Sequence, residues 1–99
     1  MIHIVWEFRV RPERRSAFEE HYSGEGAWAR LFRRSPDYHG TTLLRDVADA
    51  DRYLTVDLWT TLEAFAGFKR DAAQDYEALD VACAELTESE RRVGVFEGP

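Results

Sequence analysis

A chain of 99 residues makes one domain with a modest core, so help from a partner chain is expected. Its net charge of −6 excludes an electrostatic attraction to nucleic acid or anionic membranes. No apolar run suggests a transmembrane helix, no signal peptide precedes the first strand pattern, and a single cysteine, Cys83, indicates a reducing, cytoplasmic compartment without an internal disulfide.

The first third of the chain predicts a strand and two short helices. Residues 2–10 alternate in character with a period of two, which is typical of a strand. Pro12 suits the first turn of a helix that continues to about residue 22. Gly24 and Gly26 each weaken a helix by about 1 kcal/mol relative to alanine, so we expect a break there. A second helical segment follows over residues 27–34.

The middle of the chain predicts a hairpin followed by a helix. A four-residue turn separates residues 39–47 from residues 52–59, so these two strands are expected to pair in antiparallel fashion. Thr60 and Glu63 then form a Thr-x-x-Glu capping box, in which each side chain binds a free backbone N–H of the first helical turn. This pattern predicts a helix over residues 61–69.

The last third predicts more helix and a final strand. Apolar residues at helical spacing continue along one face, as one bent helix or as two pieces, at Tyr76, Leu79, Cys83 and Leu86. Residues 90–96 return to alternation and predict the last strand.

The order strand, helix, strand, strand, helix, strand predicts an α+β fold over residues 1–99. It is the ferredoxin-like βαββαβ arrangement, with the two helices on one face of a four-stranded antiparallel sheet. The first strand carries an apolar face with Ile2, Ile4, Trp6 and Phe8. We expect this face to meet the sheet of a second copy, and therefore predict a homodimer that pairs through its sheet faces.

Three stretches resemble the antibiotic biosynthesis monooxygenase-like (ABM) domain of the dimeric α+β barrel superfamily. They are the R-x-x-x-F-E-x-x-Y pattern of residues 14–22, WARLFRRSPDYHGTTLLRD at 28–46 and DRYLTVDLWTTLEAF at 51–65. The resemblance implies a pocket between helices and sheet, a dimer closed by its two sheets, and a pocket tryptophan at Trp59. Members of the family include cofactor-independent quinol-forming monooxygenases and haem-degrading enzymes.

The resemblance to the haem-degrading members is incomplete. In those members an asparagine on the first strand and a histidine on the second helix accompany the tryptophan. Glu7 stands near the asparagine position here, and no histidine follows His39. Haem binding or degradation is therefore the least favoured hypothesis. No cofactor is predicted, and no cluster of metal-ligand residues has ligand spacing.

A candidate site follows if the odd-numbered residues of the first and third strands face the pocket. Glu7 or Asp57 would then act as a general base on an acidic phenol or quinol, and Arg9 would hold the developing oxyanion. Oxygen would react directly with the substrate carbanion. The expected substrate-binding residues are Trp59, His3, Thr55 and Phe65.

Together with these residues, the resemblance implies a cofactor-independent monooxygenase that acts on a small aromatic or polyketide-like molecule. The alternative is a non-catalytic dimer of the same fold that binds a small molecule. The competing structural interpretations are a cross-strand ion pair for the charged residues and a core position for Trp59.

Overall fold

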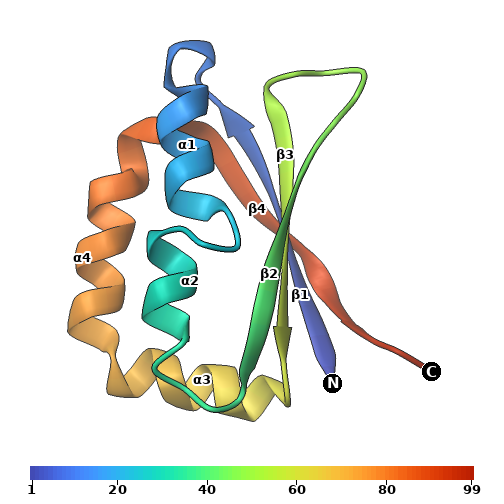
Figure 1. Cartoon of the computed structure of the whole chain (residues 1–99), viewed down its shortest axis with the longest axis vertical. Helices are drawn as coiled ribbons and strands as arrows, with labels where there is room; N and C mark the ends of the chain where they lie inside the picture. The colour runs from blue at the N-terminus through green and yellow to red at the C-terminus, as the bar shows by residue number, and fades with distance from the viewer.

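All helices lie on one face of a single four-stranded sheet (Figure 1). The computed structural model describes residues 1–99. The strands pair in antiparallel fashion in the order β2-β3-β1-β4, which confirms the predicted ferredoxin-like α+β fold. No helix has both the length and the apolar character needed to cross a membrane. In chain order the elements are β1 (Ile2–Val10), η1 (Pro12–Arg14), α1 (Arg15–Tyr22), α2 (Ala27–Phe32), β2 (Tyr38–Arg45), β3 (Arg52–Trp59), α3 (Leu62–Asp71), α4 (Ala73–Cys83), η2 (Ala84–Leu86) and β4 (Thr87–Glu97).

The register between β1 and β3 decides which residues share a face of the sheet. Trp6 lies opposite Thr55 and Phe8 lies opposite Tyr53, and antiparallel partners that lie opposite each other project to the same side. The even-numbered residues of β1 therefore face the helices together with the odd-numbered residues of β3. The prediction that the Trp6 and Phe8 face of β1 meets a second sheet is wrong, because the helices cover that face.

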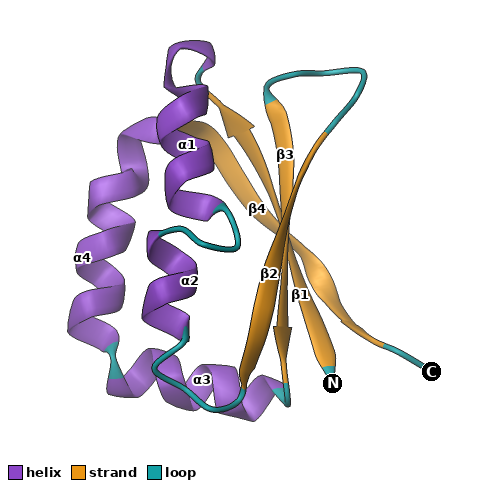
Figure 2. Ribbon diagram, in the orientation of Figure 1, coloured by secondary structure: helices purple, strands orange, loops and turns teal.

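The other face of the sheet has no helix over it, as Figure 2 shows. Leu54, Val56 and Leu58 of β3 project to this side and remain partly exposed. Phe96 of β4 is about half exposed on the same face, where its ring lies over Gly94. β3 therefore carries apolar side chains on both faces of the sheet, although the helices cover only one of them.

Two clusters of aromatic rings attach the helices to the sheet. In the first cluster Phe18 and Tyr22 of α1 stack with centroids 4.2 Å apart, and Phe18 also contacts Phe8 and Tyr53. The second cluster surrounds Phe32 of α2. Its ring lies within contact distance of six other aromatic rings, which are Trp28, Tyr38, Trp59, Phe65, Phe68 and Tyr76.

The predicted break between the two N-terminal helices is present, and close backbone approaches fix it. A Cβ at Gly26 would lie 2.5 Å from the carbonyl oxygen of Glu20 in α1, and one at Gly24 would lie 2.8 Å from the carbonyl oxygen of Thr41 in β2. Contacts below 3.0 Å leave no room for a side chain. The loop between α1 and α2 is therefore packed against both α1 and the sheet.

A β-bulge near the start of β2 changes the facing of its side chains. Tyr38 lies opposite Trp59 and Gly40 lies opposite Leu58, so His39 is an extra residue between two paired positions. Gly40 has φ of 125°, a conformation that side chains rarely adopt. The bulge places Tyr38 and Thr41, three residues apart, on the same helix-facing side.

The cap of α3 lies one residue later than predicted. Thr61, not Thr60, is the N-cap, and its side-chain oxygen accepts a hydrogen bond from the backbone N–H of Ala64 at 3.1 Å. The Thr60 hydroxyl instead donates to the carbonyl oxygen of Asp37 and contacts His39. The helical region that follows is in two pieces, because α3 and α4 meet at Ala72.

The position of the cap predicts different costs for two neighbouring substitutions. Thr61→Ala should lower the free energy of unfolding by about 1 kcal/mol, because it removes the only side-chain partner of the Ala64 N–H. Thr60→Ala should cost less, since the Thr60 hydroxyl is exposed and its backbone N–H still donates to Asp37. Urea denaturation of the two variants provides the comparison. If Thr60→Ala lowers the free energy of unfolding more than Thr61→Ala does, Thr60 would be the N-cap instead.

Candidate active site

A cavity of about 140 Å³ lies between the sheet and the helices, at the place where the two aromatic clusters meet. Phe8 and Tyr22 of the first cluster line it on one side, and Trp28, Phe32 and Tyr76 line it on the other. Its mouth is marked by three exposed charged residues, Lys69, Asp80 and Glu90. The remaining lining residues come from the sheet and are Trp6, Thr41, Thr55 and Asp57.

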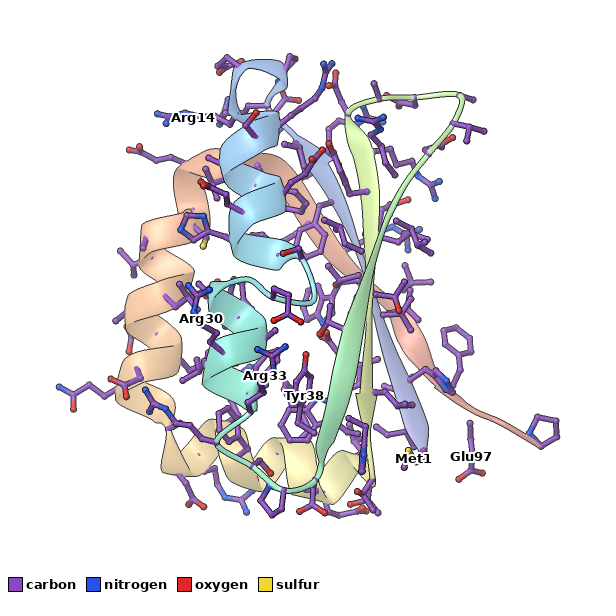
Figure 3. The ribbon with its side chains drawn as sticks, in the orientation of Figure 1. Met1, Arg14, Arg30, Arg33, Tyr38 and Glu97 are labelled. Carbon is purple, nitrogen blue, oxygen red and sulfur yellow. The ribbon has the colours of Figure 1, made fainter.

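Asp57 is the buried carboxylic acid of this cavity. It projects from the centre of β3 and is only 9% exposed. The Thr41 hydroxyl donates a hydrogen bond of 2.5 Å to Asp57 Oδ1, and the Tyr38 hydroxyl lies 2.6 Å from Thr41 Oγ1. Figure 3 shows Tyr38 in the space between the helices and the sheet. The β2 bulge makes this chain of contacts possible, because it brings Tyr38 and Thr41 to the same side.

The carboxyl group of Asp57 has no cationic partner. Burial raises its pKa to about 6, and the hydrogen bond from Thr41 offsets part of that rise because it favours the ionised form. Only Oδ1 is hydrogen-bonded to the protein, and Oδ2 is free of protein partners while keeping accessible surface. Asp57 is therefore a carboxylate near neutral pH with one oxygen available to accept a proton.

Two tyrosines bring further polar groups to the cavity. Tyr22 is only 8% exposed and Tyr76 is half-buried. Neither hydroxyl has a close hydrogen bond with another protein group, although that of Tyr22 has longer polar contacts with the Trp28 indole and the Cys83 thiol. Burial raises the pKa of Tyr22 well above its usual range, and burial together with the nearby Asp80 and Asp57 carboxylates raises the pKa of Tyr76 to about 12. Both rings are therefore neutral phenols at physiological pH.

The mouth of the cavity carries charges of both signs. The Lys69 ammonium group lies 4.9 Å from the centre of the Tyr76 ring, in a cation–π contact. Desolvation and the neighbouring Asp80 carboxylate raise the pKa of Glu90. A ligand that fills the apolar interior would pass these groups as it enters.

The structure brings together two of the predicted site residues and separates the others. Thr55 and Asp57 line the cavity. Glu7, Arg9 and His3 lie on the opposite face of the sheet, so the expectation that they share the pocket with Asp57 is wrong. The cause of this error is the register between β1 and β3, in which the odd-numbered residues of one strand project to the opposite face from the odd-numbered residues of the other.

On that opposite face the charged residues of β1 form ion pairs. Glu7 binds Arg52 at 2.6 Å and Arg91 at 2.8 Å, and these two hydrogen bonds lower the pKa of its carboxyl group. Arg9 binds Asp49 at 2.7 Å. A carboxylate held by two arginines is a poor proton acceptor, and the structural interpretation of these residues agrees with the observed contacts.

Trp59 is a core residue and does not line the cavity. Its ring is fully buried and lies 5.6 Å from Phe32, 5.4 Å from Tyr38 and 5.3 Å from Phe65. Phe65 is likewise part of the packing around Trp59 and is not among the residues that line the cavity. The expectation that Trp59 and Phe65 are substrate-binding residues of this pocket is therefore wrong for this cavity, which Phe32 lines in their place while its ring packs against Trp59.

Several cavity residues were not among those predicted. Tyr22 and Tyr76 lie on apolar helical stripes, and the sequence pattern does not separate a hydroxyl that faces a cavity from one that faces solvent. Thr41 could not be assigned, because its facing depends on the bulge at His39. No group of three or more His, Cys, Asp or Glu side chains is placed to hold a metal ion.

Known proteins share this architecture. SnoaB, a cofactor-independent oxygenase from Streptomyces nogalater, is 24% identical with a TM-score of 0.74, over 99% of this chain and 92% of that one. A Bordetella bronchiseptica protein provisionally described as an antibiotic biosynthesis monooxygenase is 21% identical with a TM-score of 0.78, over 99% and 96% of the two chains. At these identities the likeness shows the fold alone. No curated protein sequence matches the chain.

The family assignment comes from the sequence of the chain itself. Residues 1–79 match the family defined as antibiotic biosynthesis monooxygenase, a span that includes β1 to β3, the Asp57 site and most of the helical layer. The chain belongs to the antibiotic biosynthesis monooxygenase family.

Proposed function

We propose that this protein is a cofactor-independent monooxygenase in which Asp57 is the general base. The observation that carries the proposal is a buried carboxylate with one free oxygen inside an aromatic cavity. Its pKa of about 6 suits a base that must be ionised near neutral pH and still accept a proton. Membership of the family supports an oxygenase over other uses of the same cavity.

The reaction that fits this site begins with transfer of a phenol proton to Asp57. The resulting phenolate carries carbanion character at its para carbon, where molecular oxygen adds to form a peroxide. Loss of the hydrogen on that carbon and cleavage of the O–O bond give a quinone and one molecule of water. One oxygen atom enters the product and the other leaves as water. The two electrons that reduce the second atom come from the substrate.

The size of the cavity limits how much of the substrate is enclosed. A cavity of about 150 Å³ engineered into another protein binds benzene, and the cavity here is about 140 Å³. One aromatic ring therefore fits beside Asp57. A larger polyketide-like molecule would extend its remaining rings through the mouth, past Lys69 and Glu90.

Oxygen uptake with a panel of electron-rich phenols tests the proposal. Asp57→Asn should lower kcat/KM by about a hundredfold or more, since it removes the base. In the unsubstituted protein, kcat/KM should rise with pH through about 6 as Asp57 ionises. Thr41→Val should move this rise to higher pH by about one unit, because the hydrogen bond that favours the carboxylate is lost.

Thr42→Val is the matched control for this experiment. Thr42 is exposed on the opposite face of the same strand, one residue away, so its substitution should leave the pH profile unchanged. With isotopically labelled oxygen, one labelled atom should appear in the quinone. Full activity in Asp57→Asn would contradict the proposed role of the carboxylate, and ligand binding without oxygen uptake would support the non-catalytic alternative.

The same carboxylate should make the stability of the protein depend on pH. Between about pH 4 and pH 6 the folded protein holds a proton on Asp57 that the unfolded chain releases, so stability falls as pH rises through this range. Asp57→Asn keeps an acceptor oxygen for Thr41 and removes the charge. At about pH 8 this variant should be more stable by about 2–3 kcal/mol, and the gain should vanish near pH 4.

Urea denaturation at the two pH values, at one protein concentration, measures this difference. Asp49→Asn is the control of opposite sign, because Arg9 lowers the pKa of Asp49 and the ionised form is the stabilising one. Asp49→Asn should therefore lose stability at the higher pH. An equal effect of Asp57→Asn at both pH values would mean that the carboxyl group is not desolvated in the folded protein.

We also propose that two copies pair through the uncovered face of the sheet, in the cytoplasm. The partly exposed side chains of Leu54, Val56 and Leu58 support this pairing, as does the half-exposed Phe96. The cytoplasmic location is supported by the single free cysteine, Cys83.

A charge at the centre of that face should prevent pairing. Val56→Asp should convert a dimer into a monomer in sedimentation velocity, since it would bury an unpaired carboxylate between two sheets. Val47→Asp is the control, because Val47 is fully exposed in the turn between β2 and β3. A dimer that persists in Val56→Asp would place the interface elsewhere.

A further inference from the structure

Two tyrosines line the cavity with Asp57, and their hydroxyls have no close hydrogen bond with the protein. The chain has four tyrosines. The hydroxyl of Tyr53 donates to Glu19 at 2.5 Å and that of Tyr38 contacts Thr41 at 2.6 Å. Both Tyr22 and Tyr76 line the cavity, and neither hydroxyl has a close hydrogen bond with the protein; that of Tyr22 has only longer polar contacts with the Trp28 indole and the Cys83 thiol. The two tyrosines without a close hydrogen bond are therefore the two that line the cavity.

The burial of Tyr22 indicates that its hydroxyl is placed to bond a ligand. Tyr22 is more than nine-tenths buried, and a hydroxyl removed from bulk water without a partner costs free energy. The buried polar atoms that have neither a partner nor accessible surface are the indole nitrogens of Trp28 and Trp59. The two tyrosine hydroxyls are not among them, so each keeps accessible surface from which it can reach a ligand.

The two tyrosines come from different elements and line the same cavity as the Asp57 carboxylate. Tyr22 ends α1 and Tyr76 lies on α4, whereas Asp57 projects from the sheet between them. The Asp57 charge contributes to the raised pKa of Tyr76, which places these two groups within electrostatic reach. Lys69, which lies over the Tyr76 ring, holds that ring from the side of the mouth.

We infer that Tyr22 and Tyr76 donate hydrogen bonds to the substrate's phenol oxygen while Asp57 removes its proton. This inference rests on the proposed function of the site. Both tyrosines stay protonated at neutral pH and can only donate to an anionic oxygen, which strengthens the two hydrogen bonds as the phenolate forms. They take the role first expected of Arg9, which lies on the other face of the sheet. The recognised group is thus an aromatic hydroxyl, and neutral donors stabilise its anion.

Binding of para-nitrophenolate to Asp57→Asn protein tests this inference without turnover. The amide removes the charge that would repel the anion and leaves the rest of the cavity in place. In this background, Tyr22→Phe and Tyr76→Phe should each weaken para-nitrophenolate binding by about tenfold, since each removes one hydrogen bond to a charged oxygen. Neither substitution should change the affinity for nitrobenzene, which has the same ring without the phenol oxygen.

Tyr53→Phe is the matched control. It removes the hydroxyl of another buried ring, but that hydroxyl is bonded to Glu19 outside the cavity. It should leave both affinities unchanged, and near-ultraviolet circular dichroism confirms that each variant keeps its aromatic packing.

The binding results distinguish a role of the two tyrosines in ligand recognition from a role in packing alone. Equal losses for both ligands, or no loss for either, would overturn the inference and leave the two tyrosines as packing residues. Failure of Asp57→Asn protein to bind para-nitrophenolate would overturn it as well. If the tyrosine effect is found but Asp57→Asn retains oxygen uptake, the proposed function fails and the recognition of an aromatic hydroxyl stands.

Discussion

The packing of aromatic rings around Phe32 is the constraint on which the rest of the molecule depends. This ring joins α2 to β2, β3, α3 and α4 through edge and tilted contacts at 5.4–6.4 Å between ring centres. It separates the solid core around Trp59 from the cavity that contains Asp57. Because the same ring belongs to both, the position of the cavity follows directly from the way in which the helices are attached to the sheet.

The second condition for the cavity is the interruption of the N-terminal helix. An unbroken helix would carry its apolar stripe past the sheet without a gap, whereas the loop from Ser23 to Gly26 divides the aromatic layer into two clusters. Tyr22 ends one cluster and Trp28 begins the next, with ring centres 6.1 Å apart. Two glycines that touch backbone on both sides hold this division in place. The glycines that interrupt the helix therefore lie at the position along the chain where the cavity forms.

The order of elements could be predicted from the sequence, because alternation and helical spacing are local properties. The sequence also correctly predicted the break at the glycines and the hairpin. It correctly predicted two residues of β3 that line the cavity, Thr55 and Asp57. The facing of β1 relative to β3 could not be predicted, since both faces of these strands carry apolar residues and no local signal fixes the register. Glu7 and Arg9 were therefore assigned to the wrong side. Trp59 was misplaced for a related reason, because the ring that covers it comes from a helix distant in sequence.

The bulge in β2 has a consequence for the lengths that this strand can take in related proteins. His39 is the extra residue, whereas Gly40 and Thr41 after it stay opposite Leu58 and Asp57. Loss of His39 alone would leave a regular ladder in which Tyr38 and Thr41 keep these same partners on β3, so Thr41 would still face the carboxylate. Relatives that use this carboxylate should therefore occur both with and without the extra residue, and a one-residue gap at this point in an alignment would not mean that the buried acid lost its hydroxyl partner.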